Sequence, residues 1–455
     1  MKITLAPHWS VDTVDRLTVK IEVSALAVEN GQVGLHFPDQ AYGGAVPFAD
    51  YHNLQITDDL GPVSFVVKPS PSRSTDMIYQ GVYFDRAVSG EVKWTYDLTP
   101  RVLPAGYRSS PYYDFRNETG GLNGCGLFAL MMPNTEEKMQ VFWHWDLTEM
   151  PAGTRALWSY GEGDVEKVLS PYEVAFSLFN VGVMNSRENE CFGIYWYGEL
   201  ETDIDYAFNK LSQIFDYMKK YFHDEDSVFR VFLRRDPFEH SGGGSACKYA
   251  FISGYSAQKP IELEEWIKVL IHEITHTWPA MDDTVVGQGT WFEEGCTEYY
   301  CTVLSARAGL VSPEFTVEQI NEITQSRYYQ NVHRNLPADE IPKIQWQDRR
   351  AQPVPYGRGM VYLGNVDQEL RSAGQGSIDD FVAQFIKRPD PTVTDWLAFV
   401  TERLGDKGQQ EFAEMMAGKT VIPLPGIFGE KFEAVKYLTT NEDDQEIIAY
   451  RWQLK

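Results

Sequence analysis

The segment HEITH restricts the folds and functions open to this chain more than any other stretch. It contains His272 and His276, four residues apart, with Glu273 directly after the first histidine. In an α-helix, residues at this spacing lie on one face about one turn from each other, so both imidazoles can reach a single ion. Glu273 lies one step around the helix, where its carboxylate can reach a metal-bound water without binding the metal. The arrangement therefore predicts two zinc ligands and a general base on one helix.

The residues around this motif predict an amphipathic, largely buried helix. Apolar side chains recur there at a spacing of three and four residues, at Trp266, Ile267, Leu270, Ile271 and Ile274. Pro260 stands near the expected start of the helix, and Pro279 follows shortly after His276, where proline helps to end it. Two helical histidines are by themselves more often ordinary surface or core residues. The agreement of helix, base and flanking pattern favours a metal site.

An acidic residue downstream can complete the ligand set. Glu294 lies in the segment WFEEG, at the start of a second expected helix that continues through residues 297–307. Glu293 points about 100° away around that helix, and spacing alone leaves both glutamates open as the third ligand. Three protein ligands leave the fourth position of a zinc ion to water, which is typical of a catalytic site. Glu298, one turn after Glu294, is placed to hydrogen-bond the free N–H of a ligand histidine; a solvated helix glutamate is the alternative.

Composition bounds the partners and the compartment. The chain has 40 basic and 65 acidic residues, a formal net charge of −25 and a pI near 4.8. This balance argues against nucleic acid and anionic membranes as partners, because no basic surplus exists to release counterions. The first residues turn polar at once and no long apolar run follows, which predicts a cytoplasmic protein. The five cysteines are scattered and form no C-x-x-C pair, which indicates reduced thiols.

Residues 1–171 predict a β domain. Short β-branched and aromatic runs, separated by clusters of turn-forming residues, occupy residues 17–23, 31–37, 63–68, 77–84, 91–98, 126–132 and 139–147. Such runs without helical patterns between them predict an antiparallel β-sandwich. Trp143 and Trp145 are two residues apart and share one strand face; core or interface tryptophans are a better interpretation than a sugar-binding platform. His144, between them, has no metal-spaced companion and is interpreted as structural.

Residues 172–310 predict the catalytic core. Two further strand-like runs are followed by a strong helix over residues 204–222, a strand at 228–235 and a second strand candidate over 241–255, just before the HEITH helix. Glycines at the start of that last segment, Gly243 and Gly244 among them, would let a peptide substrate approach the backbone at a sheet edge. A flexible turn is an equally good interpretation.

Residues 311–455 predict a mainly helical C-terminal part. Helical periodicity covers residues 317–329, 356–374, 377–388, 393–405 and 409–418, and residues 446–454 alternate as in a closing strand pair. The whole chain is therefore expected to be an α+β multidomain protein.

HEITHTW followed by WFEEG resembles the gluzincin metallopeptidases, and within them the glycyl aminopeptidase family. The later segment YGRGMVYLGNVDQELR is similar to that family's Y-x-K-G helix start, with Arg358 in place of lysine. The resemblance implies a thermolysin-like catalytic domain after the β-sandwich, a zinc ion and hydrolysis of peptide bonds. Carried over by position, the residues would be the ligands His272, His276 and Glu294, the base Glu273 and the oxyanion donor Tyr356 from the C-terminal part.

Two departures from the family pattern leave alternatives open. The gap between His276 and Glu294 is shorter than usual, which keeps Glu293 as an alternative ligand. The family's Gly-Gly-x-Glu-His element is absent in that order, because Glu239 and His240 precede the glycines here. The expected function is thus a zinc-dependent peptidase, an aminopeptidase on short peptides. The alternatives are an endopeptidase, a non-peptide hydrolase with the same site, and an inactive binding or scaffold protein. The expected partner is a peptide; the sequence does not indicate an oligomeric state.

Overall fold

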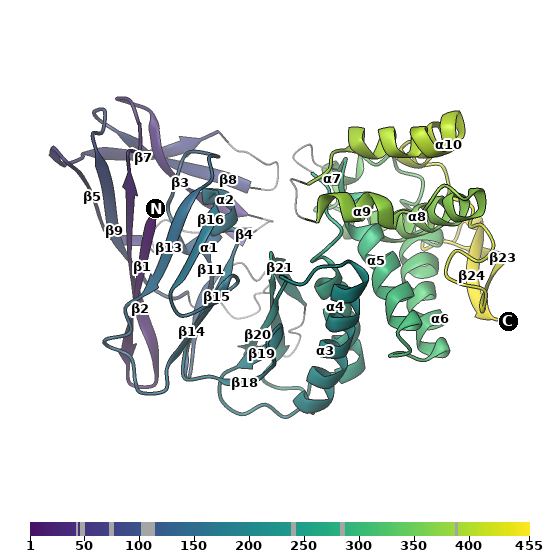
Figure 1. Cartoon of the computed structure of the whole chain (residues 1–455), viewed down its shortest axis with the longest axis horizontal. Helices are drawn as coiled ribbons and strands as arrows, with labels where there is room; N and C mark the ends of the chain where they lie inside the picture. The colour runs from purple at the N-terminus through teal and green to yellow at the C-terminus, as the bar shows by residue number, and fades with distance from the viewer. Residues whose placement is uncertain are drawn as a thin grey trace. The chain divides into compact units, whose positions relative to one another are not determined.

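The structure, a computed structural model, describes residues 1–41, 44–45, 51–71, 77–101, 114–237, 243–282, 287–386 and 390–455. The chain divides into two compact units. Unit 1 comprises Met1–Phe208 and Val228–Trp266, and unit 2 comprises Asn209–Ser227 and Ile267–Lys455. Figure 1 shows the strands of unit 1 in colours from purple to teal and most helices of unit 2 in green. A β-rich N-terminal region and a helical C-terminal part are therefore confirmed, whereas the division at residues 171 and 310 stays a prediction.

The largest sheet of unit 1 has seven strands in the order β16-β13-β1-β2-β9-β5-β6. The strands are β1 (Lys2–Ser10), β2 (Thr13–Ser24), β5 (Tyr51–Asp58), β6 (Gly61–Pro62), β9 (Glu91–Leu98), β13 (Met139–Trp145) and β16 (Val165–Leu169). Neighbours in it are antiparallel except β1 and β13, which pair in parallel. That pair departs from the purely antiparallel sandwich expected. Local alternation predicts that a strand exists, but it does not say which distant strand will lie beside it.

Two five-stranded sheets accompany it in unit 1. One contains β10 (Phe115–Glu118), β11 (Gly121–Cys125), β14 (Arg155–Trp158), β15 (Gly161–Glu162) and β17 (Leu178–Gly182); the other contains β3 (Val33–Ala41), β4 (Gly44–Ala45), β7 (Phe65–Ser70), β8 (Met77–Phe84) and β12 (Met132–Pro133). Trp143 stacks on Trp158 with ring centroids 4.2 Å apart, and both are buried. The prediction that Trp143 and Trp145 belong to the core is confirmed.

Two short helices also belong to this region, α1 (Gly126–Ala129) and α2 (Pro171–Ala175). The strand expected over residues 126–132 is wrong, because α1 occupies its first half. All four residues of α1 are buried, and a short continuous apolar run does not distinguish a buried helix turn from a buried strand.

The last sheet of unit 1 has the order β18-β19-β20-β22-β21. Its strands are β18 (Asn185–Glu188), β19 (Phe192–Trp196), β20 (Phe229–Asp236), β21 (Gly244–Cys247) and β22 (Ala250–Ser256), and the chain passes through α3 (Ile204–Tyr221) between β19 and β20. A connection of this length allows the parallel pairing of β19, β20 and β22. Gly244 begins the edge strand β21, and Gly243 before it has a φ of +91°. Glu239 and His240 lie outside the described residues.

Helices dominate unit 2. They are α3 from Asn209 onward, α4 (Leu263–Thr275, which begins in unit 1), α5 (Thr290–Arg307), α6 (Pro313–Asn321), a π-helix (Glu322–Tyr329), α7 (Ile341–Ile344), a short 3-10 helix (Arg349–Ala351), α8 (Val354–Ala373), α9 (Asp379–Phe385) and α10 (Val393–Met416). The helices expected over residues 393–405 and 409–418 form one continuous element, α10, with a kink between them at Gly405. The predicted closing strand pair is confirmed as β23 (Phe432–Thr440) and β24 (Glu446–Leu454).

A glycine contact sets the distance between α5 and α8. A Cβ atom on Gly295 would lie 2.5 Å from the backbone of Gly359, and one on Gly359 would lie 1.9 Å from the carbonyl oxygen of Trp291. Only glycine permits two helix backbones to approach so closely. Gly295 of WFEEG and Gly359 of YGRG therefore bring the first two turns of α8 beside the first two turns of α5.

Candidate metal centre

The helix α4 presents both histidines of HEITH on one face. Ile267, Leu270, Ile271 and Ile274 are fully buried, and they anchor the opposite, apolar face. The backbone N–H of His276 donates to the carbonyl oxygen of His272 at 3.3 Å. The helical turn therefore continues through His276, although α4 itself ends at Thr275.

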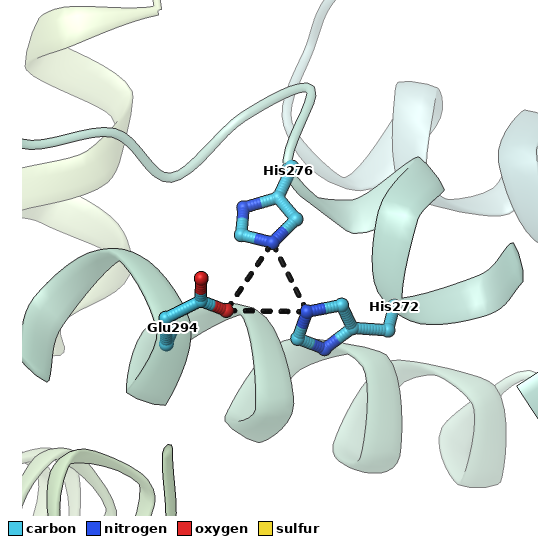
Figure 2. A group of neighbouring side chains, drawn as sticks. All are labelled: His272, His276 and Glu294. Carbon is cyan, nitrogen blue, oxygen red and sulfur yellow. Dashed lines mark hydrogen bonds and ion pairs between the residues drawn. The ribbon is translucent and has the colours of Figure 1, made fainter. Parts of the chain in front are cut away.

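His272, His276 and Glu294 converge on one point of unit 2 (Figure 2). The Nε2 atoms of the two histidines are 3.0 Å apart. Glu294 Oε2 lies 3.2 Å from His272 Nε2 and 3.5 Å from His276 Nε2. Zinc bonds of roughly 2.0–2.1 Å in a tetrahedron separate neighbouring ligand atoms by about 3.3–3.4 Å. The three observed separations therefore suit ligands of one ion.

The bonding state of these atoms also fits a cation. Glu294 Oε2 is buried and has no hydrogen-bond partner of good geometry among the described residues. A buried carboxylate oxygen without a partner is costly unless a cation compensates its charge. Two imidazoles and one carboxylate form the ligand set of a catalytic zinc site, with a fourth position left for water. Glu293 belongs to no such group of potential ligands in the described part of the chain.

Each of the two histidines has a neighbouring side chain from α5. His276 Nδ1 lies 3.2 Å from Thr297 Oγ1 in hydrogen-bond geometry, and His272 Nδ1 lies 3.2 Å from Glu298 Oε1. The thiol of Cys301 in turn donates to the Glu298 carboxylate at 3.6 Å. The Thr297 contact orients the ring of His276 and leaves its Nε2 free to bind a metal. His272 Nδ1 is close to the Glu298 carboxylate but makes no hydrogen bond of good geometry among the described residues. Sequence reasoning missed Thr297, although it shares a face of α5 with Glu294 and a helical projection would have revealed it. Cys301 lies near the site as the sequence predicts, and its spacing there favours a role in helix packing.

Tyr356 enters the same site from the first turn of α8. Its ring stacks on that of His272, with centroids 5.8 Å apart and an interplanar angle of 16°. Burial and the nearby carboxylates of Glu294 and Glu273 raise the pKa of Tyr356 well above its usual value. The phenol is therefore protonated at neutral pH and is available as a hydrogen-bond donor.

The pKa values of Glu273 and Glu294 are shifted in opposite directions. Burial raises the pKa of Glu273 above its ordinary value, although the neighbouring His272 and His276 oppose the shift. For Glu294 burial also favours the neutral form, but His276 and His272 outweigh it and lower the pKa. Glu294 is thus held as an anion, while Glu273 is a stronger proton acceptor than a solvated glutamate.

Comparison with known proteins supports a peptidase. Residues 265–354, which include HEITH and WFEEG, match the family model "M61 glycyl aminopeptidase". No curated protein sequence matches the chain significantly. The resemblance to gluzincin metallopeptidases that the sequence indicated is therefore confirmed over residues 265–354.

Solved structures share the fold. An aminopeptidase N family protein from Idiomarina loihiensis aligns with a TM-score of 0.69 and 12% identity, over 98% of this chain and 81% of its own. An M1 zinc metallopeptidase variant from Deinococcus radiodurans with bound Tyr-Ser-Ala aligns with a TM-score of 0.52 and 17% identity, over 93% and 95%. A yeast LTA4 hydrolase aligns with a TM-score of 0.56 and 13% identity, over 93% and 68%. The fold is therefore that of multidomain M1-like aminopeptidases.

Among the described residues, none of the helices has the length and apolar character needed to cross a bilayer.

Proposed function

We propose that this chain is a zinc-dependent peptidase with a thermolysin-like catalytic domain that removes N-terminal residues from short peptides. The observation that carries the proposal is the convergence of His272, His276 and Glu294 around one point, where Glu294 Oε2 is buried with no hydrogen bond of good geometry among the described residues. These three side chains would hold the zinc ion. When bound, zinc lowers the pKa of a water toward roughly 7 and polarises the substrate carbonyl.

The remaining steps belong to the side chains of the chain itself. Glu273 accepts the proton of the attacking water and passes it to the leaving amine, a role that its raised pKa suits. Tyr356 donates a hydrogen bond to the carbonyl oxygen of the substrate as that oxygen gains negative charge. Glu298 and Thr297 hold the two ligand rings in place, so the geometry is set before a substrate arrives.

Aminopeptidase action is the preferred specificity. It is supported by the match to the glycyl aminopeptidase model and by the tripeptide bound to the Deinococcus radiodurans protein of the same fold. Gly243 and Gly244, at the edge strand β21, are proposed to bind the peptide backbone. The cytoplasmic location and the exclusion of nucleic acid and membrane partners stay predictions from composition.

Metal analysis combined with a substrate panel tests this function. The panel contains aminoacyl substrates with a free amino group, the same substrates with a blocked amino group, and internally quenched peptides. We expect about one zinc per chain and turnover of the free-amino substrates alone, which is lost in Glu273→Gln. Cleavage of the blocked or internally quenched peptides would indicate an endopeptidase. Zinc-free protein without any turnover would indicate the binding or scaffold alternative.

A further inference from the structure

The residue directly after Tyr356 has no room for a side chain. Gly357 lies in the first turn of α8, and a Cβ atom on it would lie 2.6 Å from both the carbonyl oxygen of Ile323 and the Cβ atom of Tyr328. Ordinary contacts of a Cβ atom begin near 3.4 Å, so the overlap is about 0.8 Å. Neither contacting atom is the end of a flexible side chain that could turn away. Contact between two elements therefore requires glycine at this position.

The element that contacts Gly357 is a π-helix, a conformation that proteins seldom use. Residues Glu322–Tyr329 continue directly from the end of α6. The backbone N–H of Gln330 donates to the carbonyl oxygen of Gln325 at 2.9 Å, five residues back, as is typical of this conformation. Ile323 and Tyr328 are also five residues apart, so they lie one turn from each other on the same side. Both therefore face Gly357.

The start of α8 lies between this π-helix and α5. Gly357 and Gly359 are two residues apart, which is about 200° around an α-helix, so they face nearly opposite directions. Gly357 faces the π-helix, while a Cβ atom on Gly359 would lie 1.9 Å from the carbonyl oxygen of Trp291 in α5. The first turns of α8 therefore cannot move away from the π-helix without colliding with the backbone of α5.

Arg358, between the two glycines, fixes a third side of the helix. Its side chain is 1% exposed, and its Nη2 donates to the carbonyl oxygens of Arg334 at 2.8 Å and Leu336 at 2.7 Å. The hydroxyl of Tyr328, in the π-helix, is a further hydrogen-bond partner of the guanidinium. The π-helix and the segment that follows it thus hold the start of α8 through both the backbone of Gly357 and the side chain of Arg358.

We propose that Gly357 is a positioning residue, whose contact with the π-helix sets the place of the Tyr356 hydroxyl in the metal centre. The proposal rests on the proposed function of Tyr356 as oxyanion donor. Such a donor acts at roughly 2.7–3.1 Å from the oxygen that gains charge. A displacement of about 0.8 Å would take the hydroxyl out of this range, because hydrogen bonds weaken steeply with distance and angle. The three proposed zinc ligands come from other segments and keep their places.

Gly357→Ala tests the proposal in two backgrounds. In the full chain it should lower kcat by roughly 10–100-fold, with KM and zinc content unchanged. In Tyr356→Phe the same substitution should cause little further loss, because no hydroxyl remains to be misplaced. The control is Gly364→Ala on the same helix, where a Cβ atom would meet only side-chain atoms of Ile427 and Tyr299 at 3.2–3.4 Å. It should keep the wild-type kcat. Wild-type kcat in Gly357→Ala, or an equal loss in both backgrounds, would overturn the proposal.

Tyr328→Phe tests the same contact without adding an atom, in case Gly357→Ala does not fold. It removes the hydroxyl that Arg358 contacts, and it should lower kcat by a smaller factor than Gly357→Ala, only while Tyr356 keeps its hydroxyl. Wild-type kcat in Tyr328→Phe would then count against the positioning role.

Crystal structures of the zinc-loaded wild type and Gly357→Ala separate this proposal from the proposed function, because they need no turnover. The Tyr356 hydroxyl should be displaced by about 0.8 Å in the variant, while the ligands His272, His276 and Glu294 stay in place. An unmoved hydroxyl would overturn the positioning role even in an active peptidase. A displaced hydroxyl in a chain without peptidase activity would support the positioning geometry and overturn the proposed function.

Discussion

The side chains of Glu294 in unit 2 and Glu118 in unit 1 are both largely removed from solvent, but their pKa values are shifted in opposite directions. Two imidazoles face Glu294, and they keep its pKa low in spite of burial. Burial dominates at Glu118 and raises its pKa to about 7, although it accepts hydrogen bonds from the backbone N–H of Arg235 at 3.2 Å and from Asn123 at 2.9 Å. Burial alone therefore does not make a ligand. A carboxylate that binds a metal also needs neighbouring cationic or hydrogen-bonding groups that keep it ionised. One of its oxygens must in addition be free of hydrogen bonds, so that it can bind the metal.

Glu273 sharpens the comparison, because it shares the raised pKa of Glu118 but lies in the metal site. Glu273→Gln removes the proton acceptor and keeps the three proposed ligands. We expect turnover to fall by roughly 10²–10⁴-fold, with zinc content unchanged in metal analysis. Glu118→Gln, the matched change in unit 1, should leave turnover within a small factor. If Glu273→Gln lost its zinc, the claim that Glu273 acts as the base without binding the metal would be wrong.

A second prediction concerns the hydroxyl of Tyr356, which we propose acts together with Glu273 and the metal ligands during turnover. Tyr356→Phe keeps the ring stacked on His272 and removes only the hydroxyl. Turnover should fall by roughly 10²–10³-fold, as for loss of one oxyanion donor, and KM should change little. Steady-state kinetics with a parallel zinc assay measures both quantities. A variant with normal turnover would make Tyr356 a packing residue.

A third prediction concerns Thr297, whose contact with His276 has no counterpart around Glu118. We expect this contact to hold the imidazole ring in the orientation that binds zinc. Thr297→Val keeps the side-chain shape and removes the contact with His276 Nδ1. Zinc affinity, measured by competition with a chelator, should weaken by roughly 10–100-fold. Ser305→Ala removes another buried hydroxyl of α5 that has no hydrogen-bond partner among the described residues. That control should bind zinc as the wild type does, and equal weakening in both variants would indicate a general loss of stability.

The raised pKa of Glu118 predicts a pH dependence of stability. The folded chain retains a proton on Glu118 up to a pH of about 7, whereas an unfolded glutamate loses it near pH 4.3. The native state thus binds more protons in this range, and the stability of unit 1 falls as pH rises from about 4.5 to about 7, by roughly 2–3 kcal/mol. Glu118→Gln should flatten that part of the curve, as measured by urea denaturation. An unchanged difference between wild type and variant across the range would refute the assignment.

The sequence alone predicts those residues of the candidate metal site that lie at fixed spacing along one helix. His272, Glu273, His276 and Glu298 follow from helical geometry. The family pattern favours Glu294 over Glu293, and only the resemblance points to Tyr356, since no spacing links α8 to α4. The roles of these residues remain proposals, while their proximity is an observation of the structure.

What the sequence could not predict depends on contacts between distant segments. The parallel pairing of β1 with β13 joins residues more than a hundred positions apart. The approach of Gly295 to Gly359 and the contact of Gly357 with the π-helix require the packing of α8 against its neighbours to be known. Local periodicity contains no information on any of these, because each depends on which elements pack together.

Diffraction data collected at the zinc absorption edge from crystals of the zinc-loaded chain test the central claim most directly. The account predicts a single strong anomalous peak within about 2.0–2.2 Å of His272 Nε2, His276 Nε2 and a Glu294 carboxylate oxygen, with solvent at the fourth position. A peak bound to Glu293, a peak with four protein ligands, or no peak near these histidines would contradict it.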